Sequence, residues 1–141
     1  MGYTTGVFDM FHIGHLNILR QAKAQCDYLI VGVSTDELTM EYKFRRPIIG
    51  FDDRIAIVSA IRYVDLAVPQ TSMDKYHAWE KLHFDVLFHG SDWQNTDMYE
   101  KAERDLSGVG VRIVYFPYTQ GISSSMLAEK TRKTKNDGQS V

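Results

Sequence analysis

The stretch Tyr28-Leu-Ile-Val-Gly-Val33 is an apolar run rich in β-branched residues, and it does not alternate with polar residues. Such a run is typical of a strand that is buried on both faces of a sheet. Other short runs of this kind are Leu66–Val68, Val86–His89 and Val111–Phe116. A further short strand is expected at the N-terminus, over Tyr3–Gly6. The sequence therefore predicts a five-stranded sheet.

Segments with helical spacing lie between the predicted strands. Apolar residues line one face of a first helix that ends near Cys26, and a second helix around Val58 has Asp52 or Asp53 as its predicted cap. The remaining helices are predicted over Met73–Leu82, over Asp97–Leu106, and from about Ser123. Strands that alternate with helices need crossover connections, so the sheet should be mainly parallel with helices on both faces. This is an α/β, Rossmann-like fold of three α/β/α layers.

The chain has 141 residues, which suits a single domain over residues 1–130, followed by a polar tail at 131–141 that is expected to be flexible. A net charge of −2 argues against nucleic-acid binding, which needs a basic surface. No apolar run approaches the roughly 20 residues that span a bilayer, so no membrane contact is expected. Cys26 is the only cysteine, so we expect no disulfide framework and a cytoplasmic location, and we interpret it as a small core residue.

The segment Gly6-Val-Phe-Asp-Met-Phe-His-Ile-Gly-His15 ends the first predicted strand and opens the first helix, at the edge of the sheet where such folds bind ligands. A helix N-terminus presents unpaired N–H donors and a partial positive charge, which suit phosphate. His12 and His15 are three residues apart, so their imidazoles project from the same side of the first turn. Gly14 leaves room for a phosphate near the backbone, and Asp9 is placed to hold a histidine tautomer or to approach a metal ion.

Plainer interpretations of these residues remain open. The two histidines could belong to a structural zinc site, although two ligands are too few and Cys26 is poorly placed to add a third. Gly14 could serve only the packing of the helix against the strand. The locally basic loop Glu41–Arg46 could be a solvated surface rather than an element that attracts anions.

Several further motifs, in a fixed order, make the sequence pattern more specific. They are Gly6–Asp9, His12–His15, Asp27–Val31, Ser34–Glu37, Arg62–Asp65, Gly90–Trp93 and Gly121–Ser124. With them the chain resembles the cytidylyltransferase family of the nucleotidyltransferase superfamily from Thr5 to about Lys130, and its small glycerol-3-phosphate members most closely. The resemblance implies an enzyme that joins a small alcohol or polyol phosphate, with glycerol-3-phosphate as first choice, to CTP. In-line attack on the α-phosphate would give a CDP-alcohol and pyrophosphate, in cell-wall or capsule precursor synthesis.

The resemblance also implies roles for individual residues. His12, His15 and Lys43 are the implied catalytic residues, and Lys43 and Lys75 are the implied substrate contacts. Mg²⁺ is expected to arrive with the nucleotide phosphates rather than at a metal site of the protein, and the expected partners are CTP, the phosphorylated alcohol and a second copy of the chain. The implied nucleotide contacts are Val7, Phe8, Asp9, Gly14, Arg45, Arg62, Gly90, Asp92, Tyr118, Thr119, Gly121, Ile122, Ser123 and Ser124.

Some positions depart from the family pattern. Arg45 stands where a second lysine is usual, with Arg46 as its alternative in the alignment, and Ser91 replaces an aspartate. Tyr118 and Gln120 replace the arginine and the glutamate of the usual Arg-Thr-Glu-Gly segment. A tyrosine cannot neutralise a phosphate, although it can stack on a base or a ribose, so this change weakens the assignment of CTP.

Other functions therefore stay open. An adenylyltransferase that acts on a sugar phosphate with ATP is the first alternative, and a catalytically inactive nucleotide-binding regulatory protein is the second. A class I aminoacyl-tRNA synthetase also carries a His-Ile-Gly-His segment, but this chain is too short for one and is not basic. Arg62 and Asp65 could form a structural ion pair instead of binding the nucleotide. Of the other histidines, His77 and His83 are expected at the surface, and His89 is a weaker candidate for lining the site.

Overall fold

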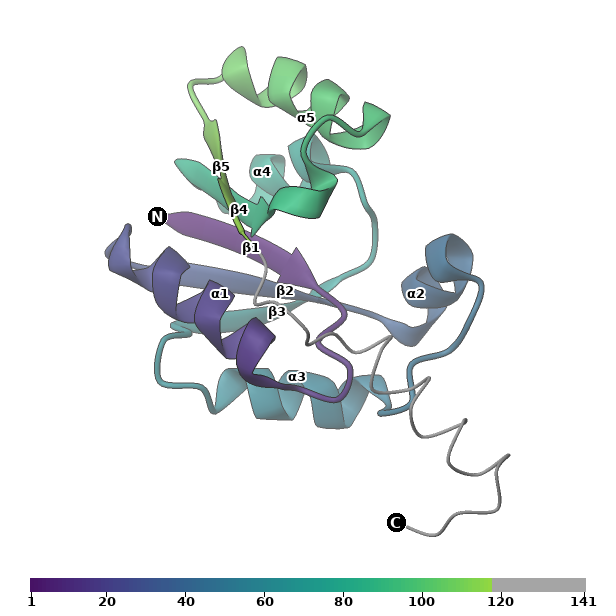
Figure 1. Ribbon diagram of the computed structural model, residues 1–141. Coiled ribbons are helices and arrows are strands. Elements are labelled where there is room, and N and C mark those ends of the chain that lie inside the picture. The colour runs from purple at the N-terminus through teal and green to yellow at the C-terminus, as the bar shows by residue number, and fades with distance from the viewer. Residues whose placement is uncertain (118–141) are drawn as a thin grey trace, which may run out of the picture.

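Residues 1–117, the part of the chain that this computed structural model describes, form one five-stranded sheet with helices on both faces (Figure 1). The strand order is β3-β2-β1-β4-β5, and every pairing is parallel. The strands are β1 (Gly2–Gly6), β2 (Leu29–Ser34), β3 (Leu66–Gln70), β4 (Val86–Gly90) and β5 (Arg112–Phe116). The helices are α1 (Ile13–Ala24), α2 (Asp36–Lys43), α3 (Phe51–Ser59), α4 (Lys75–Leu82) and α5 (Asp97–Ser107), with a short 3-10 turn, η1 (Ser91–Trp93), after β4.

The strand order reverses at β1. The chain runs outward from β1 through β2 to β3, and it then returns to the other side of β1 with β4 and β5. Ligands of doubly wound sheets bind at such a reversal, beyond the carboxyl ends of the strands. The loops that follow Gly6 of β1 and Gly90 of β4 lie at this position. The predicted α/β, Rossmann-like fold is confirmed, with its favoured ligand-binding edge next to the histidine segment.

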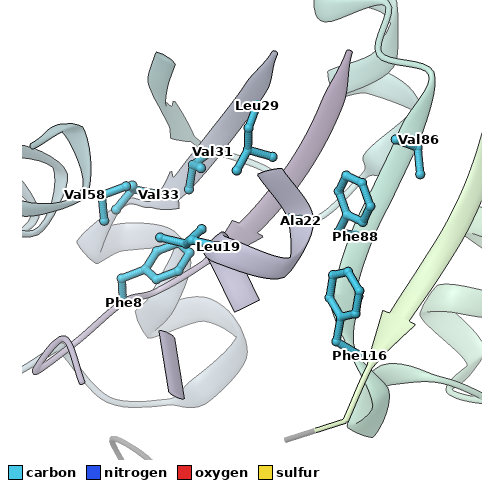
Figure 2. Close-up of a cluster of buried hydrophobic side chains, with 10 residues drawn as sticks. All are labelled: Phe8, Leu19, Ala22, Leu29, Val31, Val33, Val58, Val86, Phe88 and Phe116. Carbon is cyan, nitrogen blue, oxygen red and sulfur yellow. The ribbon is translucent and has the colours of Figure 1, made fainter. Parts of the chain in front are cut away.

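Each face of the sheet has its own hydrophobic core. On one face α1 and α3 pack against β2 and β4, and Phe8, from the loop after β1, turns its ring into the same cluster (Figure 2). On the other face α4 and α5 pack against the sheet around Tyr99 and Leu106, which are fully buried. Full burial of one large apolar side chain stabilises a fold by roughly 1.5–3 kcal/mol. Phe8 thereby anchors the loop after β1 to the core.

Helix α2 was not predicted, because the sequence pattern indicates no helix between the second strand and the helix around Val58 and a loop over Glu41–Arg46, whereas the structure has a helix over Asp36–Lys43. The local signal for this helix is nevertheless present. Thr35 caps it by accepting a hydrogen bond from the Leu38 N–H. Acidic residues occupy its first turn, where their negative charge interacts favourably with the helix dipole. Phe44 ends the helix in the left-handed conformation, with a φ of 58°. Lys43 is therefore held on a helix end rather than on a free loop.

The predicted strands and the other described helices are found within a few residues of their expected bounds. Asp52 and Asp53 lie in the first turn of α3 rather than at its cap, which is Gly50. Cys26 is half-buried and packs against the first core, as expected. The helix predicted from Ser123 and the tail at 131–141 lie outside the described residues. Within residues 1–117, none of the helices has the length and the apolar character needed to cross a membrane.

Candidate functional site

His12 and His15 form a capping box at the N-terminus of α1. Nδ1 of His12 accepts a hydrogen bond from the Gly14 N–H at 3.0 Å, and Nδ1 of His15 accepts one from the His12 N–H at 3.2 Å. The two rings are stacked, with their centroids 3.9 Å apart. The imidazoles therefore lie together on one side of the first helical turn, as their spacing predicts.

These contacts set the tautomer of both rings. Because each Nδ1 accepts a hydrogen bond, the proton of the neutral imidazole must lie on Nε2. Burial lowers the pKa of His12. Burial also lowers the pKa of His15, to about 3, and electrostatic repulsion from His12 in its protonated form and from Lys43 contributes to this shift. Both rings are therefore neutral at pH 7. Nε2 of His12 is buried and has no hydrogen-bond partner among residues 1–117, so it is a donor available to a ligand.

The loop between β1 and α1 has a strained backbone. Phe8 and Met10 have φ values of 56° and 47°, in the left-handed region where a side chain costs on the order of 1–3 kcal/mol. Asp9, which lies between them, accepts hydrogen bonds from the N–H groups of Ile48 and Ile49 at 2.8 and 2.9 Å. Backbone amides already hold the tautomers of both histidines, so the prediction that Asp9 holds a tautomer or approaches a metal ion stays a prediction. Asp9 joins this loop to the segment before α3.

Lys43 brings positive charge to the same edge of the sheet. Loss of hydration lowers the pKa of its ammonium and nearby Arg45 lowers it further, whereas Asp9 and Asp92 raise it. Lys43 is therefore within electrostatic range of both carboxylates and of His15, whose pKa it lowers. The predicted site residues that gather at the carboxyl edge are Asp9, His12, His15, Lys43, Arg45 and Asp92, beside the loops and helix start that contain Val7, Phe8, Gly14 and Gly90. A helix N-terminus, two neutral N–H donors and two cations together suit a polyphosphate.

Residues 3–130 match the family model described as Cytidylyltransferase-like. This chain belongs to the cytidylyltransferase-like family. It is therefore a nucleotidyltransferase, as the sequence predicts.

Relatives with different names are similar to this chain over most of its length. The glycerol-3-phosphate cytidylyltransferase of Staphylococcus aureus (strain NCTC 8325 / PS 47) is 33% identical over 128 residues, which are 90% of this chain and 91% of that protein. The ethanolamine-phosphate cytidylyltransferase of Mus musculus is 37% identical over 127 residues, which are 86% of this chain and 30% of that protein. A solved structure of the lipopolysaccharide core biosynthesis protein from Thermoplasma volcanium GSS1 has a TM-score of 0.70 at 25% identity, covering 84% of this chain and 94% of that one.

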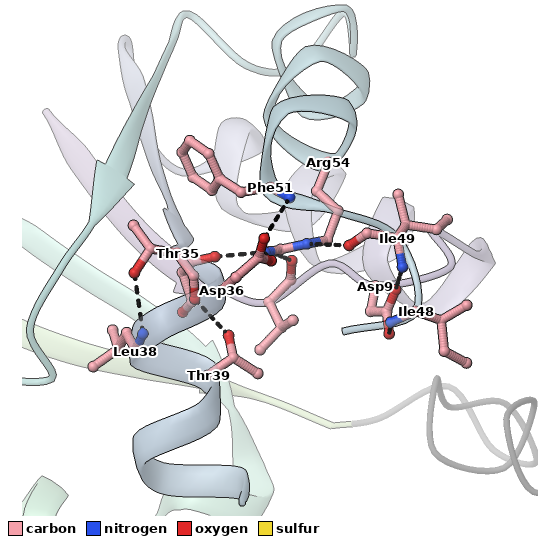
Figure 3. A network of polar contacts seen from close by, with 11 residues as sticks. Asp9, Thr35, Asp36, Leu38, Thr39, Ile48, Ile49, Phe51 and Arg54 are labelled. Carbon is pink, nitrogen blue, oxygen red and sulfur yellow. Dashed lines mark hydrogen bonds and ion pairs between the residues drawn. The ribbon is translucent and has the colours of Figure 1, made fainter. Parts of the chain in front are cut away.

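Arg54 of α3 is a part of this cytidylyltransferase-like site that the sequence interpretation missed. Its side chain is 1% exposed, and Figure 3 shows its guanidinium among polar groups from several segments. It donates hydrogen bonds of 2.7–2.8 Å to the carbonyl oxygens of Val7, Ser34 and Ile49 and to the carboxylate of Asp36. Helical spacing was the available signal, because position 54 lies one turn before the buried Val58.

Arg62 lies at the opposite edge of the sheet from the paired histidines. It is exposed in the loop that enters β3, and this loop meets the amino ends of the strands, where the Asp65 N–H donates to Leu29 O. The expectation that Arg62 contacts the nucleotide is therefore not met within one chain. The alternative Arg62–Asp65 pair is also corrected, because Asp65 pairs with Lys23 and accepts from the Leu29 N–H. Sequence spacing cannot show this, since motifs at opposite ends of a strand look alike in the sequence.

Lys75, the predicted substrate contact, lies beneath the carboxyl edge instead of at its surface. It is 2% exposed, and its Nζ donates to Thr5 Oγ1 at 3.0 Å and to Gln70 Oε1 at 2.6 Å. His89 is buried beside it, with Nε2 3.1 Å from the same Thr5 hydroxyl. Neither side chain is open to a substrate in this structure, which corrects both predictions. Lys75 is a buried amino group inside a polar network under the site.

Replacing Lys75 by methionine is expected to remove a pH dependence of stability. Burial lowers the pKa of Lys75 from 10.5 to about 7 in the folded protein, so between these values the unfolded chain binds more protons. The free energy of unfolding should therefore rise with pH over this window, by up to about 1.4 kcal/mol per pH unit. Urea unfolding of the parent and the variant at several pH values above 7 gives the difference between their free energies of unfolding. The contributions of titrating groups other than Lys75 cancel in this difference. Parallel curves for the two proteins would show that Lys75 titrates normally.

Some predicted residues cannot be placed. Tyr118, Thr119, Gly121, Ile122, Ser123 and Ser124 lie outside the described residues. His77 and His83 are exposed, as expected. Within residues 1–117, no three His, Cys, Asp or Glu side chains are grouped so as to hold a metal ion.

Proposed function

We propose that the protein transfers a cytidylyl group from CTP to a small phosphorylated alcohol, with glycerol-3-phosphate as the first candidate. The main support is the pair of neutral histidines at the start of α1, where the buried Nε2 of His12 has no partner among the described residues. Relatives named glycerol-3-phosphate and ethanolamine-phosphate cytidylyltransferase support a phosphorylated alcohol as the acceptor class.

The proposed reaction is an in-line displacement at the α-phosphorus of CTP. An oxygen of the acceptor phosphate attacks the α-phosphorus and forms a new P–O bond. The bond from that phosphorus to the oxygen bridging the α- and β-phosphates breaks, and this oxygen leaves with pyrophosphate. Because the acceptor phosphate is already ionised near pH 7, no general base is needed. Catalysis then depends on positioning the two phosphates and neutralising the charge that develops.

The residues at the carboxyl edge divide this work between them. The neutral imidazoles of His12 and His15 donate hydrogen bonds from Nε2 to oxygens of the triphosphate, as their tautomers require. Lys43 and Arg45 supply positive charge, with Lys43 directed to the acceptor phosphate. A hydrogen-bond donor that is already fixed toward the reacting phosphate stabilises the transition state far more than a solvated donor, because it does not reorganise during the reaction.

Mg²⁺ is proposed to bind together with the nucleotide. Residues 1–117 contain no group of three His, Cys, Asp or Glu side chains suited to a metal. The proposed ligands of the ion are phosphate oxygens and water, which is the usual mode of Mg²⁺ at nucleotide sites. When bound, the ion neutralises part of the phosphate charge.

One observation keeps ATP as a second candidate nucleotide. Tyr118 stands where the family pattern has an arginine, and a tyrosine removes a cation from the expected phosphate contacts. An adenylyltransferase acting on a sugar phosphate would use the same histidines and the same displacement.

Pyrophosphate release tests the proposal in a grid of CTP, ATP, GTP and UTP against glycerol-3-phosphate, ethanolamine phosphate and several polyol and sugar phosphates, with Mg²⁺ present. Release is expected with CTP and glycerol-3-phosphate. Release with ATP and sugar phosphates alone would replace the proposal by the adenylyltransferase. Silence in every pairing, with nucleotide still bound in calorimetry, would indicate a regulatory protein without catalysis.

A further inference from the structure

Arg54 is a buried cation whose surroundings the proposed chemistry leaves unexplained. An arginine has five N–H donors, and four hydrogen bonds from Arg54 are used within the protein. Its guanidinium is fully buried, so it touches no substrate, and among residues 1–117 Asp36 alone supplies a compensating charge, at 2.7 Å. A buried arginine without this partner would be strongly unfavourable, so the pair acts as a unit.

The acceptors of Arg54 come from separate segments that lie together at the carboxyl edge of the sheet (Figure 3). Val7 O belongs to the loop after β1, Ser34 O ends β2, and Asp36 begins α2. Ile49 O belongs to the segment that connects α2 to α3. One guanidinium therefore fixes both ends of the stretch that contains Lys43, and it fixes that stretch to the loop that leads to the paired histidines.

The loop after β1 depends on such external contacts. Phe8 and Met10 hold left-handed backbone conformations that would relax without restraint. The restraints are Arg54 on Val7 O, the ring of Phe8 in the core, and Asp9 on the amides of Ile48 and Ile49. Arg54 and Asp9 thus both connect the loop after β1 to the segment before α3. Arg54 does so from beneath the carboxyl edge of the sheet, and Asp9 does so at this edge.

We propose that Arg54, together with Asp36, is a positioning residue for nucleotidyl transfer. The pair sets the distance between Lys43 and the histidines by clamping the Val7–Met10 loop to residues 44–50. The inference rests on the proposed function for its kinetic consequence, whereas the clamp itself can be tested without any substrate. A lysine cannot replace Arg54, because its ammonium is a point charge and lacks the planar fork that reaches separate carbonyl groups.

Hydrogen exchange tests the clamp directly in Asp36→Asn and Arg54→Lys. The Ile48 and Ile49 amides, which donate to Asp9, are expected to exchange at least about tenfold faster in both variants. The Val111 amide, which donates to Leu106 O at the other side of the sheet, should keep its rate. Asp53→Asn makes the same chemical change on an exposed residue next to Arg54 and should leave all three amides unchanged. Unchanged exchange at Ile48 and Ile49 in Asp36→Asn would overturn the clamp.

Kinetics test what the clamp does for catalysis. Asp36→Asn is expected to lower kcat by about 10- to 100-fold, with a smaller change in KM for CTP, because misplacement of about 1 Å has effects of this size. In a Lys43→Gln background the same substitution should lower kcat less than about threefold, since the group that it positions is already absent. A full, multiplicative loss in that background would mean general destabilisation and would overturn the positioning role. If the parent protein releases no pyrophosphate, the proposed function fails, and the exchange rates still decide the clamp.

Discussion

His12→Asn is expected to lower the rate of pyrophosphate release by about 10²- to 10³-fold, the usual effect of removing one fixed donor to a transition-state oxygen. Asparagine is a good N-cap, so its side-chain oxygen can replace Nδ1 of His12 as acceptor for the Gly14 N–H. The helix start should therefore survive while the Nε2–H donor is lost. Steady-state kinetics together with thermal unfolding separates the two roles of this histidine.

His15→Gln is the matched variant for the second ring. A glutamine at this position of a capping box can still accept from the backbone N–H of His12, so α1 should again be preserved. Its activity is expected to fall by an amount similar to that of His12→Asn. Full activity in either variant with an unchanged melting temperature would mean that the histidines only cap the helix, and the proposed chemistry would have to be abandoned.

The second large effect is expected for Lys43→Gln, with a loss in kcat/KM of about 10- to 100-fold, because a hydrogen bond to a charged group is typically worth about 1.5–3 kcal/mol. Lys43 lies in the last turn of α2, where a cation also interacts favourably with the helix dipole. Lys81→Gln is the matched control, since Lys81 occupies the last turn of α4. The control should share the small loss of helix stability and keep full activity.

The salt dependence of the same variants gives a second readout. If Lys43 binds a phosphate, the parent enzyme should lose affinity for the acceptor as ionic strength rises, and Lys43→Gln should lose much less. Equal salt sensitivity in the parent and in Lys43→Gln would place the acceptor phosphate elsewhere in the site.

Two kinds of information about the site came directly from the sequence. Uninterrupted apolar runs such as Tyr28–Val33 predict buried strands, because a strand that is covered on both faces has apolar side chains on both and shows no alternation with polar residues. The spacing of His12 and His15 predicts paired imidazoles at a helix start, because three residues are nearly one helical turn. Both predictions depend on residues that are close together in the chain, so they can be made from the sequence alone.

The roles of the charged residues were harder to predict. Arg54 is followed by an apolar face but resembles an ordinary surface residue after two aspartates, and only its contacts with Val7 and Ser34 show that it is buried. Lys75 looks like a substrate contact until the fold brings Thr5 and Gln70 to its ammonium. A charged side chain has the same appearance in a sequence whether it meets water, a ligand or another buried group.

The sequence by itself determined the order of the described strands and helices apart from α2, the parallel sheet and the helix start that presents the histidines, because each depends on periodicity or on residues close in the chain. The tertiary structure alone decided that Asp9 bonds to Ile48 and Ile49, that Arg54 joins several segments, and that Arg62 lies at the opposite edge. These outcomes depend on which distant segments become neighbours when the sheet closes, and for a charged group that neighbourhood sets its hydration, its partners and therefore its role.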